Sequence, residues 1–103
     1  MARVRYSLDF EEIKRSICVL DALTAVGWRP AYQRAKGGRG PCPLHGSKDP
    51  RSRSFRFTAN QWYCGRCKIG GDVLRLWALI QDQEILEAAY DLCESLGRTP
   101  PYR

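Results

Sequence analysis

The chain has 103 residues, a length that suits one domain with one hydrophobic core. Seventeen lysines and arginines against eleven aspartates and glutamates give a net charge of +6, which favours a polyanionic partner such as nucleic acid. Charges interrupt every apolar run well before the ~18 residues that a membrane span needs. The opening stretch, Met-Ala-Arg-Val-Arg-Tyr, has no features of an export signal, so we expect a cytoplasmic protein.

Two short helices are predicted at the N-terminal end, over about residues 9–26. Ser7 or Asp9 can cap the first helix, and Gly27 is a natural stop for the second. Apolar residues recur at helical spacing between these signals, namely Phe10, Ile13, Ile17, Leu20, Leu23 and Val26.

A small antiparallel sheet is predicted over about residues 28–68. We expect a strand from Trp28 to Tyr32, followed by a hairpin turn in the glycine-rich stretch 36–40. Residues 54–58 alternate with period two, and residues 61–64 return as a partner strand after a turn at Ala59-Asn60.

Two further helices are predicted over about residues 72–97. Asp72 can cap the first, Gly97 lies past the end of the second, and Pro100-Pro101 prevents continuation. The expected fold class is therefore α+β, a small antiparallel sheet flanked by N-terminal and C-terminal helices, with residues 1–103 forming one domain.

The cysteines predict a metal site. Five cysteines in a chain without an export signal argue against a disulfide framework. Cys42-x-x-His45 and Cys64-x-x-Cys67 are instead two pairs at the spacing of zinc ligands, and His45 is the chain's one histidine. Iron can also take sulfur ligands, but an imidazole in the set favours zinc.

This ligand set predicts one structural zinc ion in a zinc ribbon. Three thiolates and one imidazole fill all four tetrahedral positions, so no position is left for a catalytic water. The binding energy of such an ion is folding energy. The other two cysteines, Cys18 and Cys93, lie in apolar surroundings, and we expect them in or near the core.

Positive charge is concentrated in the predicted sheet and zinc segment. Residues 29–68 hold ten basic side chains and one acidic one, whereas residues 69–103 hold three basic and six acidic ones. Cations interleaved with aromatic rings suit a single strand of nucleic acid. If Phe55 and Phe57 face the core, Arg56 faces solvent, and only one of Trp62 and Tyr63 shares its face. The expected nucleic-acid-binding residues are Lys48, Arg51, Arg53, Arg56, Trp62, Tyr63, Arg66 and Lys68.

These motifs together resemble the N-terminal Cys-His-Cys-Cys zinc-binding domain of bacterial DnaG-type DNA primases. The resemblance runs from about Phe10 to Gly97, and its motifs are Cys42-Pro43-x-His45, Lys48, Ser54-Phe55, Trp62-Tyr63, Cys64-x-x-Cys67-x-x-Gly70-Gly71-Asp72-Val73 and Leu96-Gly97. The resemblance implies that Cys42, His45, Cys64 and Cys67 bind zinc. It also implies a role in recognising single-stranded template DNA during primer initiation. The segment 49–53 is longer than the family's and adds two arginines.

We therefore expect a stand-alone, zinc-stabilised module that binds single-stranded DNA in replication or in a mobile-element process. Primases carry a separate catalytic domain, and few acidic residues here lie near the basic segment, so we do not expect an enzyme. The expected partners are DNA and a replication enzyme, such as a primase catalytic subunit or a helicase. The alternative is an adaptor whose acidic helical end docks a replication or transposition protein. A metal-dependent hydrolase or nuclease is disfavoured by the closed ligand set.

Overall fold

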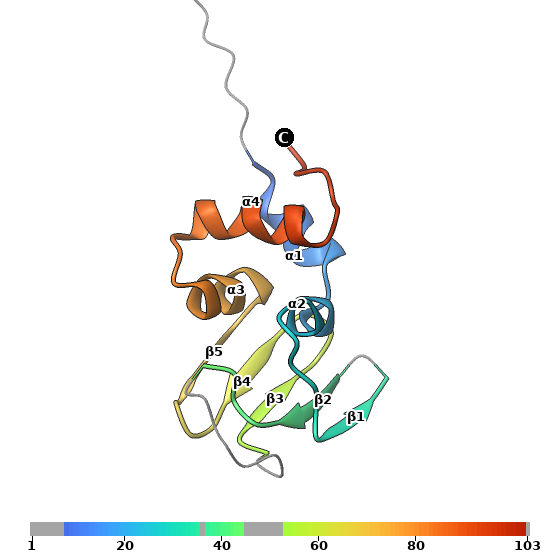
Figure 1. Ribbon diagram of the computed structural model, residues 1–103, viewed down its shortest axis with the longest axis vertical. Helices are drawn as coiled ribbons and strands as arrows, with labels where there is room; N and C mark the ends of the chain where they lie inside the picture. Colours follow the sequence, from blue (N-terminus) through green and yellow to red (C-terminus); the bar gives the residue numbers. More distant parts are fainter. Residues whose placement is uncertain (1–7, 36, 45–52, 103) are drawn as a thin grey trace, which may run out of the picture.

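The protein is described by a computed structural model that covers residues 8–35, 37–44 and 53–102. A five-stranded antiparallel sheet forms one end of the molecule, and the helices stack beyond it (Figure 1). The predicted α+β class is confirmed. His45, Lys48, Arg51 and the candidate cap Ser7 lie outside the described residues.

The N-terminal helices are α1 (Phe10–Ser16) and α2 (Val19–Ala25). The carboxylate of Asp9 caps α1 by accepting a hydrogen bond from the N–H of Glu12 at 3.1 Å. Gly27 follows α2 with a φ of +81°, the left-handed conformation in which glycine commonly ends a helix.

The C-terminal helices are α3 (Val73–Gln81) and α4 (Ile85–Ser95). Asp72 caps α3, since its carboxylate accepts from the N–H of Arg75 at 2.9 Å. The backbone turns between the two helices at Asp82, which has a φ of +54°. The caps predicted at Asp9 and Asp72 are both present.

The strands follow one another in the order β1-β2-β3-β4-β5, and every neighbouring pair is antiparallel. Their bounds are β1 (Tyr32–Arg34), β2 (Gly37–Gly40), β3 (Phe55–Phe57), β4 (Trp62–Cys64) and β5 (Ile69–Gly71). The fifth strand extends the sheet beyond the predicted limit at residue 68.

Two details of the predicted hairpin are wrong. The first strand begins at Tyr32 and does not cover residues 28–31, and Gly37–Gly40 is strand β2, not a turn. A Cβ atom on Gly40 would lie only 2.7 Å from the Trp28 ring. Glycine is needed there because the indole packs directly on the backbone of the strand.

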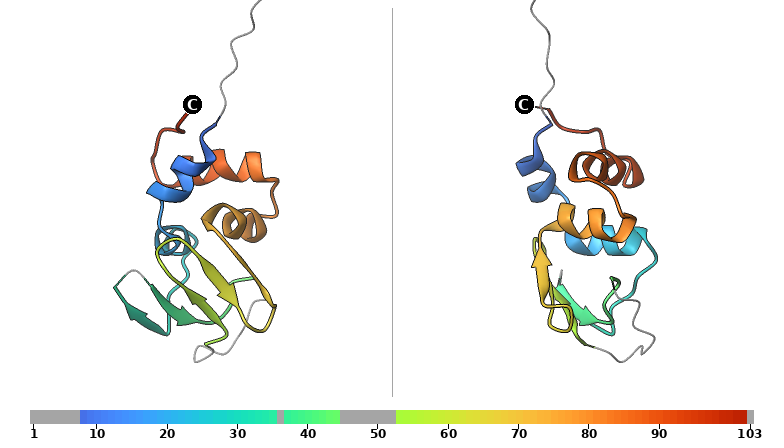
Figure 2. Two further views of the ribbon diagram at one scale, coloured as in Figure 1. Left: turned by 180° about the vertical axis from the view of Figure 1, so that it is seen from behind. Right: turned by 90° about the vertical axis from the view of Figure 1, so that its left-hand side faces the viewer.

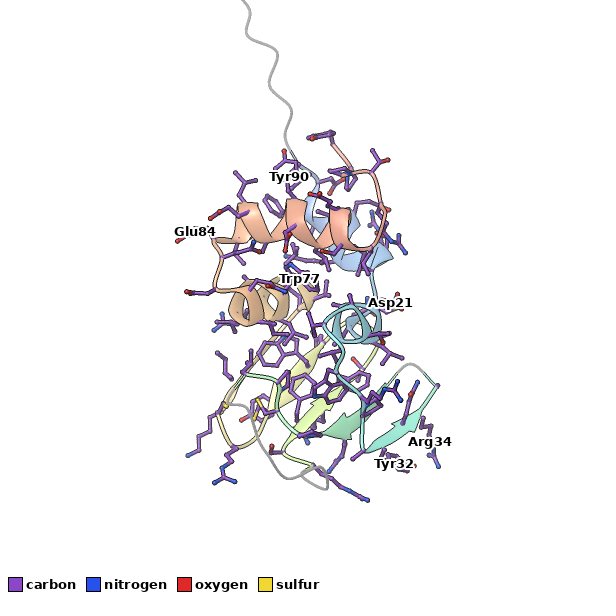
Figure 3. All side chains as sticks on the ribbon, viewed as in Figure 1. Asp21, Tyr32, Arg34, Trp77, Glu84 and Tyr90 are labelled. Carbon is purple, nitrogen blue, oxygen red and sulfur yellow. The ribbon has the colours of Figure 1, made fainter. Side chains whose placement is uncertain are left out.

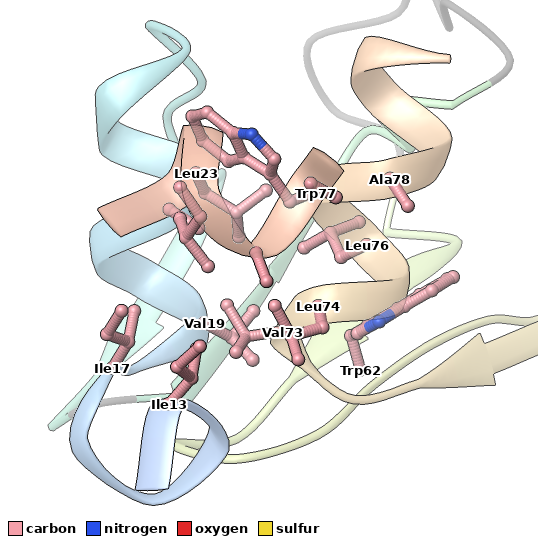
Figure 4. Packing of buried hydrophobic residues seen from close by; sticks show 14 of the residues in the cluster. Ile13, Ile17, Val19, Leu23, Trp62, Val73, Leu74, Leu76, Trp77 and Ala78 are labelled. Carbon is pink, nitrogen blue, oxygen red and sulfur yellow. The ribbon is translucent and has the colours of Figure 1, made fainter. Parts of the chain in front are cut away.

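The inner face of the sheet is aromatic. Phe55, Phe57 and Trp62 are buried, and the Phe55 ring stacks on Trp62 with centroids 5.7 Å apart. Apolar side chains from the helices complete the same cluster, including Ile13, Val19, Leu23, Val73 and Leu74 (Figure 4).

Each tryptophan N–H has an acceptor. Trp28 donates to the Pro41 carbonyl at 2.7 Å, Trp62 to the Asp72 carbonyl at 2.7 Å, and Trp77 to the Asp91 carboxylate at 2.8 Å. These bonds satisfy the indole N–H groups that burial would otherwise leave unpaired, and each one ties two chain segments together.

The ends of the described chain meet at the helical end, where Leu8 forms an isolated bridge with Tyr102 (Figure 2). None of the described helices is both long and apolar enough to cross a membrane.

Replacing Asp72 by alanine removes the cap of α3 and the ion pair with Lys14, whose N–O distance is 3.4 Å. We expect a loss of about 1 kcal/mol in the free energy of unfolding, the usual contribution of a cap. Urea denaturation measures it. Asp72→Asn keeps a capping oxygen, so a loss equal to that of Asp72→Ala would contradict the capping role.

Candidate zinc centre and nucleic-acid interface

Three of the four predicted metal ligands meet at one point of the fold. The Sγ atoms of Cys42, Cys64 and Cys67 all lie within 4.8 Å of one another, and those of Cys42 and Cys67 are 3.8 Å apart. Two sulfurs on a tetrahedral zinc ion, each bound at ~2.3 Å, are about 3.8 Å apart. The spacing therefore fits a shared zinc ion.

The three cysteines lie near the ends of strands and in a turn, where backbone N–H groups also point at the sulfurs of two of them. Cys42 follows β2, Cys64 ends β4, and Cys67 lies in the turn before β5. The N–H of Leu44 donates to the Cys42 sulfur at 3.4 Å, and the N–H of Cys67 donates to the Cys64 sulfur at 3.3 Å. A two-residue spacing thus directs backbone N–H groups as well as side chains at the metal position.

The electrostatics of Cys64 also suit a metal ligand. Burial acts to raise the pKa of its thiol, but hydrogen bonds from the backbone N–H groups of Cys67 and Arg66 and from neighbouring thiols outweigh burial, so the pKa lies below its ordinary value. Zinc binds the thiolate form. The donor set fits one structural zinc ion, and His45 stays the predicted fourth ligand.

The other two cysteines lie away from this cluster. Cys93 is buried in α4, and burial raises the pKa of its thiol. Cys18 is half-buried at the N-terminus of α2. Both agree with the predicted core or near-core positions.

On the outer face of the sheet, one row of side chains crosses the four strands β1 to β4 and ends beside Gly70 of β5. Strand pairing places Tyr32 opposite Arg39, Arg39 opposite Arg56, Arg56 opposite Tyr63, and Tyr63 opposite Gly70. Directly paired residues point to the same face. We call the four side chains of Tyr32, Arg39, Arg56 and Tyr63 the outer row.

Each tyrosine ring of the outer row has an arginine beside it. The Arg56 guanidinium carbon lies 5.3 Å from the centre of the Tyr63 ring, and that of Arg53 lies 6.0 Å from the centre of the Tyr32 ring. A Cβ atom on Gly70 would come within 2.9 Å of the Tyr63 ring. The glycine therefore leaves room for this ring to lie against the sheet.

The outer row borders a shallow hollow of about 460 Å³ whose rim also includes Arg34, Thr58 and Gln61. Tyr32 and Arg34 project from the edge strand of the sheet in Figure 3. Of the nucleic-acid residues predicted from the sequence, the structure brings Arg53, Arg56 and Tyr63 to this surface, while Arg66 and Lys68 are exposed in the turn beside Cys67.

Trp62 does not fit its predicted role in base stacking, because its side chain is only 3% exposed and its indole N–H donates to the Asp72 carbonyl. Side chains alternate along β4, so Tyr63 is the residue of the pair that faces outward with Arg56. Sequence reasoning missed Tyr32 as a surface ring and did not include Arg34 and Arg39 in the site. The concentration of basic residues in 29–68 pointed to both arginines, but only the pairing of the strands brings them to the same surface as Arg56.

Comparisons with known proteins agree with these observations. No family model matches the chain. The DNA primase of Aquifex aeolicus (strain VF5) is 27% identical over 94 residues, which are 89% of this chain and 18% of that primase. The crystal structure of the zinc-binding and RNA polymerase domains of Aquifex aeolicus primase matches 92% of this chain and 23% of its own, with 26% identity and a TM-score of 0.69.

The resemblance to the zinc-binding domain of a DNA primase is confirmed. The chain spans about a fifth of the length of these two relatives. Its three clustered cysteines and this similarity together support one structural zinc ion.

Removing zinc tests the role of the cluster. We expect one zinc ion per chain by elemental analysis, and we expect Cys64→Ser to lose it and to lower the melting temperature, because bound zinc contributes directly to folding. Cys18→Ser is the matched control, since Cys18 is outside the cluster. Equal zinc loss in both variants would contradict the assignment. His45→Ala tests the predicted fourth ligand by the same measurement.

Proposed function

We propose that the primase-type module binds single-stranded DNA across the outer face of its sheet, in replication or in a mobile-element process. The observation that carries this proposal is the outer row, two arginines side by side between two tyrosines. Guanidinium groups neutralise phosphates, and tyrosine rings stack on bases.

The dimensions of the outer row suit a short stretch of single strand. Neighbouring strands are about 4.8 Å apart, so the two tyrosines, three strands apart, are separated by roughly 14 Å. That span accommodates about two to three nucleotides, with Arg39 and Arg56 facing the phosphates between two stacked bases. Duplex DNA hides the faces of its bases in the helical stack, so the rings favour a single strand.

Electrostatics support the same surface. In residues 29–35, 37–44 and 53–68 the described charged side chains are all basic. They include Arg34, Arg53, Arg66 and Lys68 around the outer row. A field of one sign attracts a polyanion and accelerates its binding.

We assign no catalysis to the module. Its similarity to a primase lies in the zinc-binding part, and the proposed zinc site is closed by four ligands. We propose that it works in the cytoplasm and supplies DNA recognition to a replication enzyme, such as a primase catalytic subunit or a helicase.

The binding test is a titration of labelled oligonucleotides with the zinc-loaded protein, followed by anisotropy at several salt concentrations. We expect tighter binding to single-stranded than to duplex DNA, and at least ~10-fold weaker binding by Arg39→Ala with Arg56→Ala. The salt slope of that variant falls by about 0.7 for each phosphate that it no longer neutralises. Arg15→Ala with Arg98→Ala removes the same charge from the helical end and is the control. Equal losses of affinity in both double variants would refute the sheet as the site.

Tyr63→Ala tests the stacking role separately from charge. We expect it to weaken binding by about 1–3 kcal/mol, the contribution of one stacked base, with an unchanged salt slope. Tyr63→Phe keeps the ring and is expected to bind nearly as the wild type does. A loss as large in Tyr63→Phe would show that the hydroxyl, not the ring, makes the contact.

A further inference from the structure

We propose that the outward side of α4 binds a basic amphipathic helix of a partner protein. This surface lies at the opposite end of the molecule from the sheet (Figure 1). Large apolar side chains are exposed there, with Leu86 55%, Tyr90 38% and Tyr102 45% accessible.

The exposed apolar residues form a stripe. Leu86 and Tyr90 are four positions apart, which places them one above the other on the helix. They lie outside the face of α4 that packs inward through Ala88, Ala89, Leu92 and Cys93. In Figure 3 the Tyr90 side chain extends on the side of α4 away from α3. The hydroxyls of Tyr90 and Tyr102 are 3.4 Å apart, so the C-terminal segment extends the stripe.

Acidic side chains border this stripe. Residues 82–96 contain five acidic residues and no basic one. Asp91 already has a partner within the chain, because its carboxylate accepts a hydrogen bond from the Trp77 N–H at 2.8 Å. Glu87 and Glu94 are exposed on the outward side, and the ion pairs of the described residues run to Glu11, Glu12 and Asp72, none to α4.

The apolar stripe and its acidic border together indicate which kind of partner binds. An apolar stripe beside carboxylates complements a helix with one apolar face and flanking lysines or arginines. Glu87 and Glu94 are seven residues apart, about 10.5 Å along the axis, which matches basic residues spaced by two turns on a helix that lies alongside. The acidic border repels DNA, so a nucleic acid does not fit this surface.

A second copy of the chain fits poorly. Within the described part of the chain, the basic residues that form no ion pair lie mainly on and around the sheet, whereas Lys14 and Arg15 on α1 are already paired with Glu11 and Glu12. A basic helix of a partner protein therefore complements this surface better than a second copy of the chain does. With the sheet and α4 at opposite ends, one molecule can hold DNA and a protein together.

The probe is a synthetic amphipathic helical peptide of leucine and lysine, titrated into the zinc-loaded protein by calorimetry. A peptide of the same composition, scrambled so that it has no apolar face, is the control. We expect the amphipathic peptide to bind at least ~10-fold more tightly, since the apolar stripe contributes only when apolar side chains align with it. Equal binding of the two peptides, or no binding of either, would overturn the proposal.

Variants locate the binding surface. We expect Leu86→Ser, and Glu87→Lys with Glu94→Lys, each to weaken peptide binding by about 10-fold. Glu11→Lys with Asp21→Lys makes the same charge change on exposed positions of α1 and α2 and is the matched control. Equal losses in the two charge variants would reduce the effect to net charge and contradict the proposal. Leu86→Ser is expected to keep its zinc and its affinity for single-stranded DNA, which separates this surface from the sheet.

Discussion

The metal cluster is the constraint on which the rest of the structure depends. The strands are only three or four residues long, too short to form a stable sheet by backbone pairing alone. Cys42 follows β2, while Cys64 and Cys67 flank the turn between β4 and β5. One zinc ion on these sulfurs therefore links the segments on the two sides of β3.

Strand alternation gives this small sheet two separate tasks. Phe55, Phe57 and Trp62 point inward and build the aromatic core, while Arg56 and Tyr63 on the same strands point outward. Whatever fixes the inner rings also fixes the outer row, since the two sets share one backbone. The described acidic residues lie on the helices or at their ends, and none lies on a strand, so no described carboxylate belongs to the outer row.

Local signals in the sequence predicted much of this arrangement. The spacing of Cys42, Cys64 and Cys67 predicted the cluster, and Asp9 and Asp72 predicted helix starts, because such signals act within a few residues. Pairing between distant segments was not predictable in the same way. The glycine-rich stretch 37–40 is a strand because Trp28 and Phe57 pack on it, and the outer row exists only through the register of four strands.

The most direct test maps DNA onto the folded protein by NMR. A single-stranded thymidine oligonucleotide is titrated into the ¹⁵N-labelled, zinc-loaded protein, and amide shift changes are recorded. The account predicts the largest changes at Tyr32, Arg39, Arg56 and Tyr63, with α4 unaffected. Changes confined to α3 and α4, or none at low salt, would contradict the claim that the sheet is the DNA-binding surface.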